Sequence, residues 1–411
     1  VLVHRSLVFH VLWQDPRLHW LLSEFRLLVN ESIRVAVKED IRSRARLVRA
    51  AYRDLSARHA VYKQYIPSAF EVALGTLKTY RRRLRRGKRS LVPYVRRPSL
   101  KAENQSYRLD RDTGRLRIPI RGTEGVQIHL PLSDWHRSIL GDPTWSLGSL
   151  TVVPGKVIVV VRKAAPKPFQ PEGAIALDTN EDSLDGVVAS GNAARSVRMP
   201  FDGVRQVQAI HFRRRTMLAR KKAHDRRVAR RLLDCEGRRE RNRVRQRLHR
   251  VSKRLVQLAK RSRAAIVLED LTLRGAGSRS RRMNRRLSSW PRGEIHRQVE
   301  YKAALEGVPI IKVNPRWTSK TCPACGARRR DRVGKVFVCL MCDWEMDRQI
   351  NAGMNILKTA LASNETLARA VRFQPGALRD DVVSPLYDLP RGGAGARDEP
   401  SGVELGVSRI A

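Results

Sequence analysis

Four of the chain's five cysteines are spaced for metal binding. They form two Cys-x-x-Cys pairs, Cys322-Pro-Ala-Cys325 and Cys339-Leu-Met-Cys342, with thirteen residues between the pairs. Four thiolates at this spacing satisfy a tetrahedral structural Zn²⁺ ion, and the sequence between the pairs fits a small hairpin. A closed four-cysteine site leaves no position for water, so this zinc is predicted to support folding and not catalysis. The fifth cysteine, Cys235, is predicted to be an ordinary thiol in a basic helix.

Two acidic residues form the second candidate site. Asp178 ends the apolar segment AIALD, and Glu269 ends the apolar segment AIVLE. Carboxylates at the carboxyl ends of strands can hold Mg²⁺, which activates water and stabilises the leaving oxygen in phosphodiester cleavage. For either residue alone, a helix N-cap or a surface acid after a strand is the favoured interpretation. The pair, followed by a zinc ribbon, favours a metal-dependent nuclease site.

The charge of the chain indicates a polyanionic partner. Lys and Arg number 83 against 39 Asp and Glu, a formal net charge of +44. Such a charge opposes compaction unless a polyanion neutralises it, and nucleic acid does so with release of counterions. A solvated basic surface, as in ribosomal proteins, is the alternative. The residues predicted to contact phosphates lie in an Arg-rich helical stretch, and they are Arg213, Arg214, Arg215, Arg238, Arg239, Arg241 and Arg243.

The elements that position these residues fall into two parts. Residues 18–62 and 68–86 have helical periodicity, whereas residues 91–163 carry short alternating strands with turn signals. This pattern predicts a small β-barrel or sandwich with helices inserted in it. After a Pro-rich linker near residues 163–171, the strands that end at Asp178 and Glu269 alternate with long helices over 204–262, which predicts an α/β domain.

The compartment is predicted from what the sequence lacks. The longest apolar runs are too short to cross a membrane, and the first residues are too short and broken for a signal peptide. Paired cysteines favour metal in a reducing compartment over disulfides. We therefore expect a cytoplasmic, nucleoid-associated protein with no membrane partner.

Several stretches in order along the chain resemble one family. They are LDTNEDSLDGVV, RRERNRVRQRLHRVSKRLV, AIVLEDL, YKAALEGVPIIKVNPRWTSKTCPACG and DRQINAGMNI. In this order they are similar to the TnpB proteins of insertion sequences, the compact relatives of type V CRISPR effectors. The resemblance covers roughly residues 20–360, which is most of the chain by any domain-size measure.

The resemblance implies a multidomain α+β architecture. A β-barrel wedge domain would hold an inserted helical recognition domain, and an RNase H-like (RuvC) α/β domain carrying the Cys₄ zinc ribbon would follow. The implied boundaries are 1–17 and 91–170 for the wedge domain, 18–90 for the recognition domain, 171–316 and 347–362 for the RuvC-like domain, 317–346 for the ribbon, and 363–411 for a disordered tail.

The resemblance also implies an activity. The protein would bind a guide RNA, recognise a double-stranded DNA target and cleave it with Mg²⁺, with Asp178 as the first RuvC acid and Glu269 as the second. At the third position the family pattern is Asp-Arg-Asp-x-Asn, where the second Asp binds metal. Here the run is Asp347-Arg348-Gln349-Ile350-Asn351. Because an amide is a neutral ligand, either Asp347 substitutes or the protein is a guide-directed DNA binder without nuclease activity.

A strand-transferring transposase fits poorly. Single-strand transposases of this transposon type use a His-x-His metal site and a Tyr nucleophile, and none of the ten His residues lies two positions from another. A ribosomal or structural RNA-binding protein would explain the charge, but it would not explain the two acids at the ends of strands.

Overall fold

A computed structural model of the chain describes residues 2–378 apart from 222–224, 226–227, 271–279 and 329. By its internal contacts the chain divides into two units, Val1–Ala165 and Pro166–Ala411. The part of the predicted tail that follows residue 378 lies outside the described residues. None of the described helices combines the length and the apolar character needed to cross a membrane.

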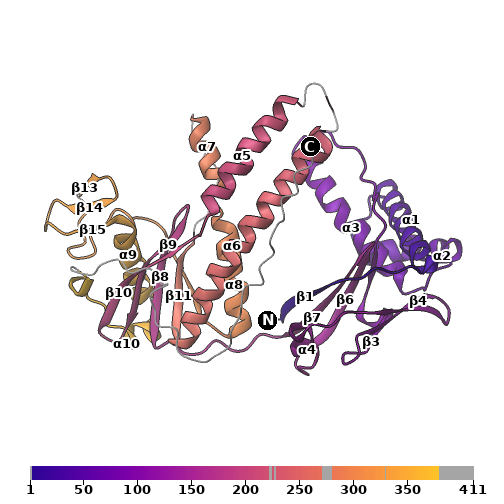
Figure 1. The fold of residues 1–411 in the computed structure, drawn as a ribbon, viewed down its shortest axis with the longest axis horizontal. Coiled ribbons are helices and arrows are strands. Elements are labelled where there is room, and N and C mark those ends of the chain that lie inside the picture. The colour runs from indigo at the N-terminus through magenta and orange to yellow at the C-terminus, as the bar shows by residue number, and fades with distance from the viewer. Residues whose placement is uncertain (1, 222–224, 226–227, 271–279, 329, 379–411) are drawn as a thin grey trace, which may run out of the picture. The chain divides into compact units, whose positions relative to one another are not determined.

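The first unit combines helices with two antiparallel sheets (Figure 1). One sheet has the order β1-β7-β6-β2 and the other has the order β3-β4-β5. The strands are β1 (Leu2–His10), β2 (Leu100–Ala102), β3 (Arg108–Leu109), β4 (Arg115–Arg121), β5 (Glu124–His129), β6 (Ser146–Val153) and β7 (Lys156–Ala164). The helices are α1 (Pro16–Lys38), α2 (Arg44–Arg58), α3 (Tyr65–Leu84), the short 3₁₀ helix η1 (Asn104–Ser106) and α4 (Asp134–Leu140).

The helical stretch expected over 18–62 is two helices. The first, α1, begins where the Asp15 carboxylate accepts the Arg17 backbone N–H at 2.9 Å, with Pro16 in the first turn. Between α1 and α2 the chain turns at Asp40, whose φ of 43° is incompatible with a continuing helix. Helix α3 is joined to the smaller sheet by the Tyr65 hydroxyl, which donates to the Pro119 carbonyl at 2.8 Å.

A five-stranded mixed sheet forms the centre of the second unit (Figure 1), with the order β10-β9-β8-β11-β12. The central strand β8 pairs antiparallel with β9 and parallel with β11. These strands are β8 (Gly173–Thr179), β9 (Ser183–Ser190), β10 (Ala193–Pro200), β11 (Ala264–Glu269) and β12 (Ile310–Val313).

The remaining elements of this unit are helices and a small three-stranded sheet. The helices are α5 (Val204–Lys221), the π-helical turn η2 (Val228–Leu232), α6 (Leu233–Arg261), α7 (Arg281–Ser289), α8 (Arg292–Glu306), α9 (Arg348–Ser363), α10 (Glu365–Ala370) and the 3₁₀ turn η3 (Pro375–Leu378). The small sheet consists of β13 (Arg330–Val333), β14 (Val336–Cys339) and β15 (Glu345–Asp347).

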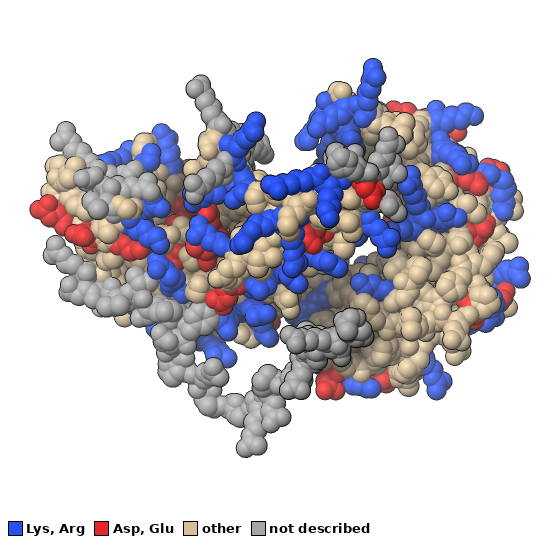
Figure 2. Space-filling model, turned by 45° about the horizontal axis from the view of Figure 1, so that its top comes forward, with Lys and Arg blue, Asp and Glu red and all other residues tan. Residues whose placement is uncertain are grey.

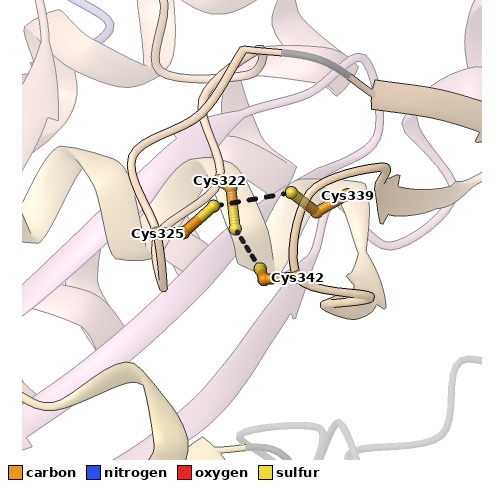
Figure 3. A group of neighbouring side chains, drawn as sticks. All are labelled: Cys322, Cys325, Cys339 and Cys342. Carbon is orange, nitrogen blue, oxygen red and sulfur yellow. Dashed lines mark hydrogen bonds between the residues drawn. The ribbon is translucent and has the colours of Figure 1, made fainter.

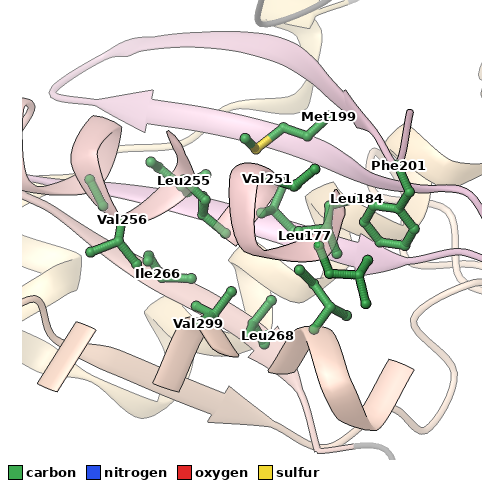
Figure 4. Close-up of a cluster of buried hydrophobic side chains, with 14 of the residues drawn as sticks. Leu177, Leu184, Met199, Phe201, Val251, Leu255, Val256, Ile266, Leu268 and Val299 are labelled. Atoms are coloured by element: carbon green, nitrogen blue, oxygen red, sulfur yellow. The ribbon is translucent and has the colours of Figure 1, made fainter. Parts of the chain in front are cut away.

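Alternation along β8 and β11 gives the large sheet two apolar faces. Leu177 and Leu268 point to one face, where they pack against α6 and α8 side chains such as Leu255 and Val299 (Figure 4). The residues of opposite parity on the two strands point to the other face with side chains of α9 and the small sheet, and they are Ala174, Ala176, Ala265 and Val267. We call this second side the α9 face.

Two glycines let α9 approach the sheet closely. A Cβ added to Gly353 of α9 would lie 2.4 Å from the Cα of Gly186 on β9. A Cβ added to Gly186 would lie 1.9 Å from the Ala176 carbonyl oxygen. A side chain at Gly353 would therefore push the helix away from β9, whereas one at Gly186 would collide with the backbone of β8.

Three local expectations differ from the structure. The stretch from 363 to 378, expected to be disordered, contains α10 and η3, because Leu367, Val371 and Leu378 bury themselves in the core of the α9 face. The basic run RSRRMNRR at 279–286 predicts a flexible loop, but its described part belongs largely to α7, which Ser280 caps. Strand β10 is absent from the sequence-based expectation altogether.

The glycine contact gives a stability prediction. Gly353→Ala is expected to lower the free energy of unfolding by about 1–3 kcal/mol or more, because overpacking displaces α9 from β9. Gly293→Ala, in α8, is the control, because an added Cβ there meets nothing within 4 Å. It is expected to be neutral or to stabilise by about 0.5–1 kcal/mol. Urea denaturation measures both, and equal stability of the two variants would contradict the close contact.

Candidate functional site

The four paired cysteines meet at one point (Figure 3). Their sulfurs all lie within 4.8 Å of one another. Cys322 Sγ lies 3.7 Å from Cys342 Sγ, and Cys325 Sγ lies 3.6 Å from Cys339 Sγ. A tetrahedron with Zn–S bonds of about 2.3 Å has edges of about 3.8 Å, whereas a disulfide would bring two sulfurs to about 2.05 Å. The donor set therefore fits zinc, which would supply a structural crosslink.

The loops that carry these cysteines are tight turns. The Gly326 N–H donates to the Cys322 carbonyl, and Gly326 has a φ of 76°. The Asp343 N–H donates likewise to the Cys339 carbonyl. The backbone N–H of Ala327 lowers the pKa of Cys325 to about 7, which favours the thiolate that binds metal. The ribbon thus presents its ligands through backbone geometry.

Asp178 and Glu269 stand at the ends of neighbouring strands. The parallel register pairs Leu177 with Leu268, so the two acids follow at the same level. Both have the parity of Ala176 and Val267, and they therefore point to the α9 face. Asp178 is partly exposed, and Glu269 is buried with a carboxylate oxygen that accepts the Thr318 hydroxyl at 2.5 Å.

A third carboxylate, which sequence reasoning missed, faces Asp178. The antiparallel register pairs Asp178 with Asp185 on β9, and it pairs Asp185 with Arg198 on β10. The three side chains form a cross-strand row on the α9 face, which we call the Asp178–Asp185–Arg198 row. Asp185 is completely buried, and Arg198 Nε donates to its Oδ1 at 2.7 Å. Its Oδ2 accepts the Ser183 hydroxyl and the Asn180 amide.

The start of α9 meets the end of this row. Gln349 Oε1 accepts a hydrogen bond from Arg198 Nη2 at 3.0 Å. Asp347 is the N-cap of α9, with Oδ1 accepting the Gln349 N–H at 2.8 Å and Oδ2 lying 3.5 Å from Arg198 Nη2. Among the residues that the structure describes, the four cysteines form the only group of three or more His, Cys, Asp or Glu close enough to share an ion. Asp347 therefore does not complete a compact triad with Asp178 and Glu269.

The electrostatics reflect these neighbours. Burial first, and then the charges of Glu269 and Asp185, raise the pKa of Asp178 to about 7. Burial also raises the pKa of Glu269, against the opposing hydrogen bond from Thr318. The pKa of Asp185 is raised by burial, although Ser183 and Arg198 act in the opposite direction. Without a metal ion, these surroundings therefore oppose the simultaneous ionisation of all three carboxyl groups.

The two carboxylates have the donor chemistry of a magnesium site. Mg²⁺ is usually held by one or two protein carboxylates, with water and phosphate oxygens completing its shell. Asp178 and Glu269 offer such oxygens at adjacent strand ends. Beside them lie the Arg198 guanidinium, the neutral amide of Gln349 and the Asp347 carboxylate, whose oxygens already meet the α9 backbone and Arg198.

The arginines predicted to contact phosphates lie on α5 and α6, which pack against each other. Four of them already meet partners within the unit: Arg214 and Arg239 lie near Glu236, Arg215 pairs with Glu240, and Arg243 donates to His211. Arg213, Arg238 and Arg241 are exposed, and no ion pair within the described part of the chain engages them. Figure 2 shows Lys and Arg spread over the face that it draws.

Trp290 and Trp317, two aromatic residues that could stack on bases, differ in their surroundings. Trp290 Nε1 donates to the Asn180 carbonyl at 2.8 Å, which indicates a packing role. Trp317 is 37% exposed. Its ring lies within 6 Å of the cationic groups of Arg316, Lys320 and Arg328. An exposed aromatic ring among cations suits a nucleobase and its phosphate.

Two family models match parts of the chain. Residues 293–356, which include α8 and the zinc ribbon, match the Cas12f1-like, TNB domain. Residues 21–119 match the Uncharacterized protein MJ0013 family.

Curated proteins and solved structures extend the similarity. TnpB-like protein MJ0012 of Methanocaldococcus jannaschii is 31% identical over 155 residues, which are 38% of this chain and 69% of that protein. TnpB-like protein MJ0751 of the same organism is 26% identical over 241 residues, 57% of this chain and 86% of that protein. The CRISPR-associated endodeoxyribonuclease Cas12f1 of Sulfoacidibacillus thermotolerans is 35% identical over 112 residues, 26% of this chain and 25% of that protein. A cryo-EM structure of a Cas12f1–sgRNA–target DNA complex matches in fold with a TM-score of 0.58 and 13% identity, over 84% of this chain and 83% of that chain.

Zinc removal is expected to unfold the ribbon. Cys339→Ser should lower the metal content by one Zn²⁺ per chain and reduce the melting temperature, because a structural site contributes its binding free energy to folding. Cys235→Ser is the control, since that thiol lies outside the cluster. Elemental analysis with thermal melting measures both. Unchanged zinc in Cys339→Ser would contradict the assignment.

Asp178→Asn is expected to stabilise the magnesium-free, zinc-loaded protein at pH 8. The native carboxyl keeps its proton up to about pH 7, whereas the unfolded one loses it near 3.8, so wild-type stability falls as pH rises through this window. Asn has no proton to lose. Its advantage should therefore reach about 1–3 kcal/mol above pH 7 and vanish near pH 4.

Urea denaturation at pH 8 and pH 5 measures this difference. Asp182→Asn is the matched control, because Asp182 lies in the same hairpin with 47% of its side chain exposed and an exposed partner, Arg205. It is expected to change stability by no more than about 0.5 kcal/mol. An Asp178→Asn variant that is less stable than the wild type at pH 8 would contradict the burial argument.

Proposed function

Because the chain belongs to the TnpB family, which is related to the type V CRISPR effectors, we propose that it is an RNA-guided, Mg²⁺-dependent DNA endonuclease associated with a transposable element. The observation that carries this proposal is the placement of Asp178 and Glu269 at adjacent strand ends on one face of the five-stranded sheet. The similarity to a named endodeoxyribonuclease supports the same reaction class.

The proposed domains follow the chain order. The wedge domain would comprise 1–17 and 91–170, with the recognition domain, 18–90, inserted in it. In support, β1 pairs with β7 along its whole length, so strands from both sides of the three helices α1–α3 share one sheet. The RuvC-like domain would comprise 171–316 and 347–362 with the ribbon, 317–346, between its last strand and α9.

The chemistry of the proposed site rests on the chain's own carboxylates. A Mg²⁺ ion held by Asp178 and Glu269 would activate water and stabilise the leaving oxygen of a phosphodiester. Thr318 orients Glu269 by donating to one of its oxygens, which leaves the other for the ion. Asp178 is partly exposed, and a phosphate can therefore approach it.

The proposed partners are a guide RNA and a double-stranded DNA target. A structure with the same fold contains both an sgRNA and target DNA. The exposed arginines of α5 and α6 would contact phosphates, which position a nucleic acid without reading its sequence. Trp317 offers a stacking surface for a base.

A second candidate function is guided DNA binding without cleavage. The observation that favours it is Gln349, which accepts from Arg198 and occupies the place of the family's third acid. An amide supplies no charge to hold or polarise Mg²⁺. The protein would then act on its target by occupying it.

Plasmid cleavage separates the two candidates. The purified protein with its cognate RNA and Mg²⁺ is expected to cut a matching plasmid, and Asp178→Ala and Glu269→Gln are expected to reduce the rate by at least about 10³-fold, since each removes a metal ligand. RNA-dependent gel shifts with the same plasmid sequence check that both variants still bind.

Two other outcomes of this experiment would contradict the first candidate function. Target binding without cutting by the wild type, with cutting gained in Gln349→Asp, would establish the second candidate in place of the first. No RNA-dependent binding to the target would overturn both.

A further inference from the structure

We infer that Arg198 is a resident cation that takes the place of a second metal ion, so that the acidic site holds one divalent cation and not two. This inference rests on the proposed function, because it concerns the metal of that site.

The two carboxylates of the Asp178–Asp185–Arg198 row need a positive charge nearby. Side chains directly opposite each other in an antiparallel pair have Cβ atoms about 4.5–5.5 Å apart. Two carboxylates at that separation, one of them fully buried, cannot both ionise without a nearby cation. Arg198, opposite Asp185 on the next strand, supplies that cation through its Nε donor.

Asp185 is too fully engaged to serve as a metal ligand. Its Oδ2 accepts two hydrogen bonds, at 2.5 Å from Ser183 Oγ and 2.8 Å from Asn180 Nδ2. Its Oδ1 accepts one from Arg198 at 2.7 Å. A metal ion would have to displace the guanidinium from a buried carboxylate, which would leave the row with a second unpaired charge to accommodate.

Gln349 completes the same unit from the helix side. Its amide oxygen accepts from Arg198 Nη2, which ties β10 to the first turn of α9. The position that a third ligand would take is therefore filled by a guanidinium that is bound to Asp185 of β9 and to the start of α9. About a third of the Arg198 side chain is exposed, and Nη1 has no acceptor in the described part of the chain, so this group can meet a phosphate oxygen.

The test counts bound Mn²⁺ by electron paramagnetic resonance on zinc-loaded protein at pH 8. The wild type is expected to bind one Mn²⁺, which Asp178→Asn with Glu269→Gln removes. Arg198→Gln is expected to bind a second Mn²⁺ because it frees Asp185. Arg198→Lys keeps the charge and should stay at one. Arg195→Gln, an exposed arginine of the same strand, is the charge-matched control and should also stay at one.

Thermal melting gives a second, independent readout. Without Mn²⁺, Arg198→Gln is expected to melt about 6 °C or more below the wild type, because Asp185 loses its buried counterion. Millimolar Mn²⁺ should recover most of that loss. A merely structural role for Arg198 would give the loss without the recovery, and that result would overturn the inference, as would two Mn²⁺ ions in the wild type.

A double variant covers the case in which Arg198→Gln does not fold. Asp185→Asn with Arg198→Gln removes both charges of the pair, and it is expected to bind one Mn²⁺ with affinity within about threefold of the wild type. Affinity reduced by about tenfold or more would identify Asp185 as a metal ligand and overturn the inference. Absence of any Mn²⁺ in the wild type would instead remove the proposed nuclease function, whereas two ions would leave that function standing.

Discussion

The pairing of β8 with β9 sets the constraint on which the acidic site depends. It places Asp178 opposite the buried Asp185, and it places Glu269 beside Asp178 through the parallel pairing with β11. Three carboxylates on one apolar face raise the free energy of the metal-free fold. The same interactions that cost stability, burial and like charge, are those that attract a divalent cation.

Helix α9 completes the acidic site by placing its N-terminus beside the buried charges. Gly353 and Gly186 allow the helix to lie against the strands, and that contact brings the helix N-terminus beside Arg198. Strand β15 ends at Asp347, where the chain enters α9. Because β15 pairs with β14, which ends at Cys339, the small sheet connects the Cys₄ cluster to the helix that carries Gln349.

Much of this arrangement can be predicted from the sequence pattern, but part of it cannot. The four cysteines, the apolar strands that end at Asp178 and Glu269, and the long basic helices carry strong local signals. Asp185 and Arg198 do not. Asp185 lies inside a strand whose apolar run, Val187–Ala189, begins two residues later, and β10 has the sequence AARSVRMP, which has weak alternation. The GN turn after β9 was the available sign of a hairpin, since Gly and Asn favour positive φ there.

The effect of the neutral Gln349 on the charge of the site depends on whether the Asp178–Asp185–Arg198 row is counted with it. If only the third acid of the family pattern is considered, the site has one negative charge fewer and therefore a lower affinity for Mg²⁺. Counted over the site and its nearest charges, Asp178, Asp185, Glu269 and Asp347 carry four negative charges when ionised, and Arg198 and Arg348 carry two positive charges. The remainder is two negative charges, which one divalent cation balances. Gln349 then belongs with Arg198, because its amide accepts a hydrogen bond without adding a carboxylate to Asp185 and Asp347, which already share the charge of this guanidinium.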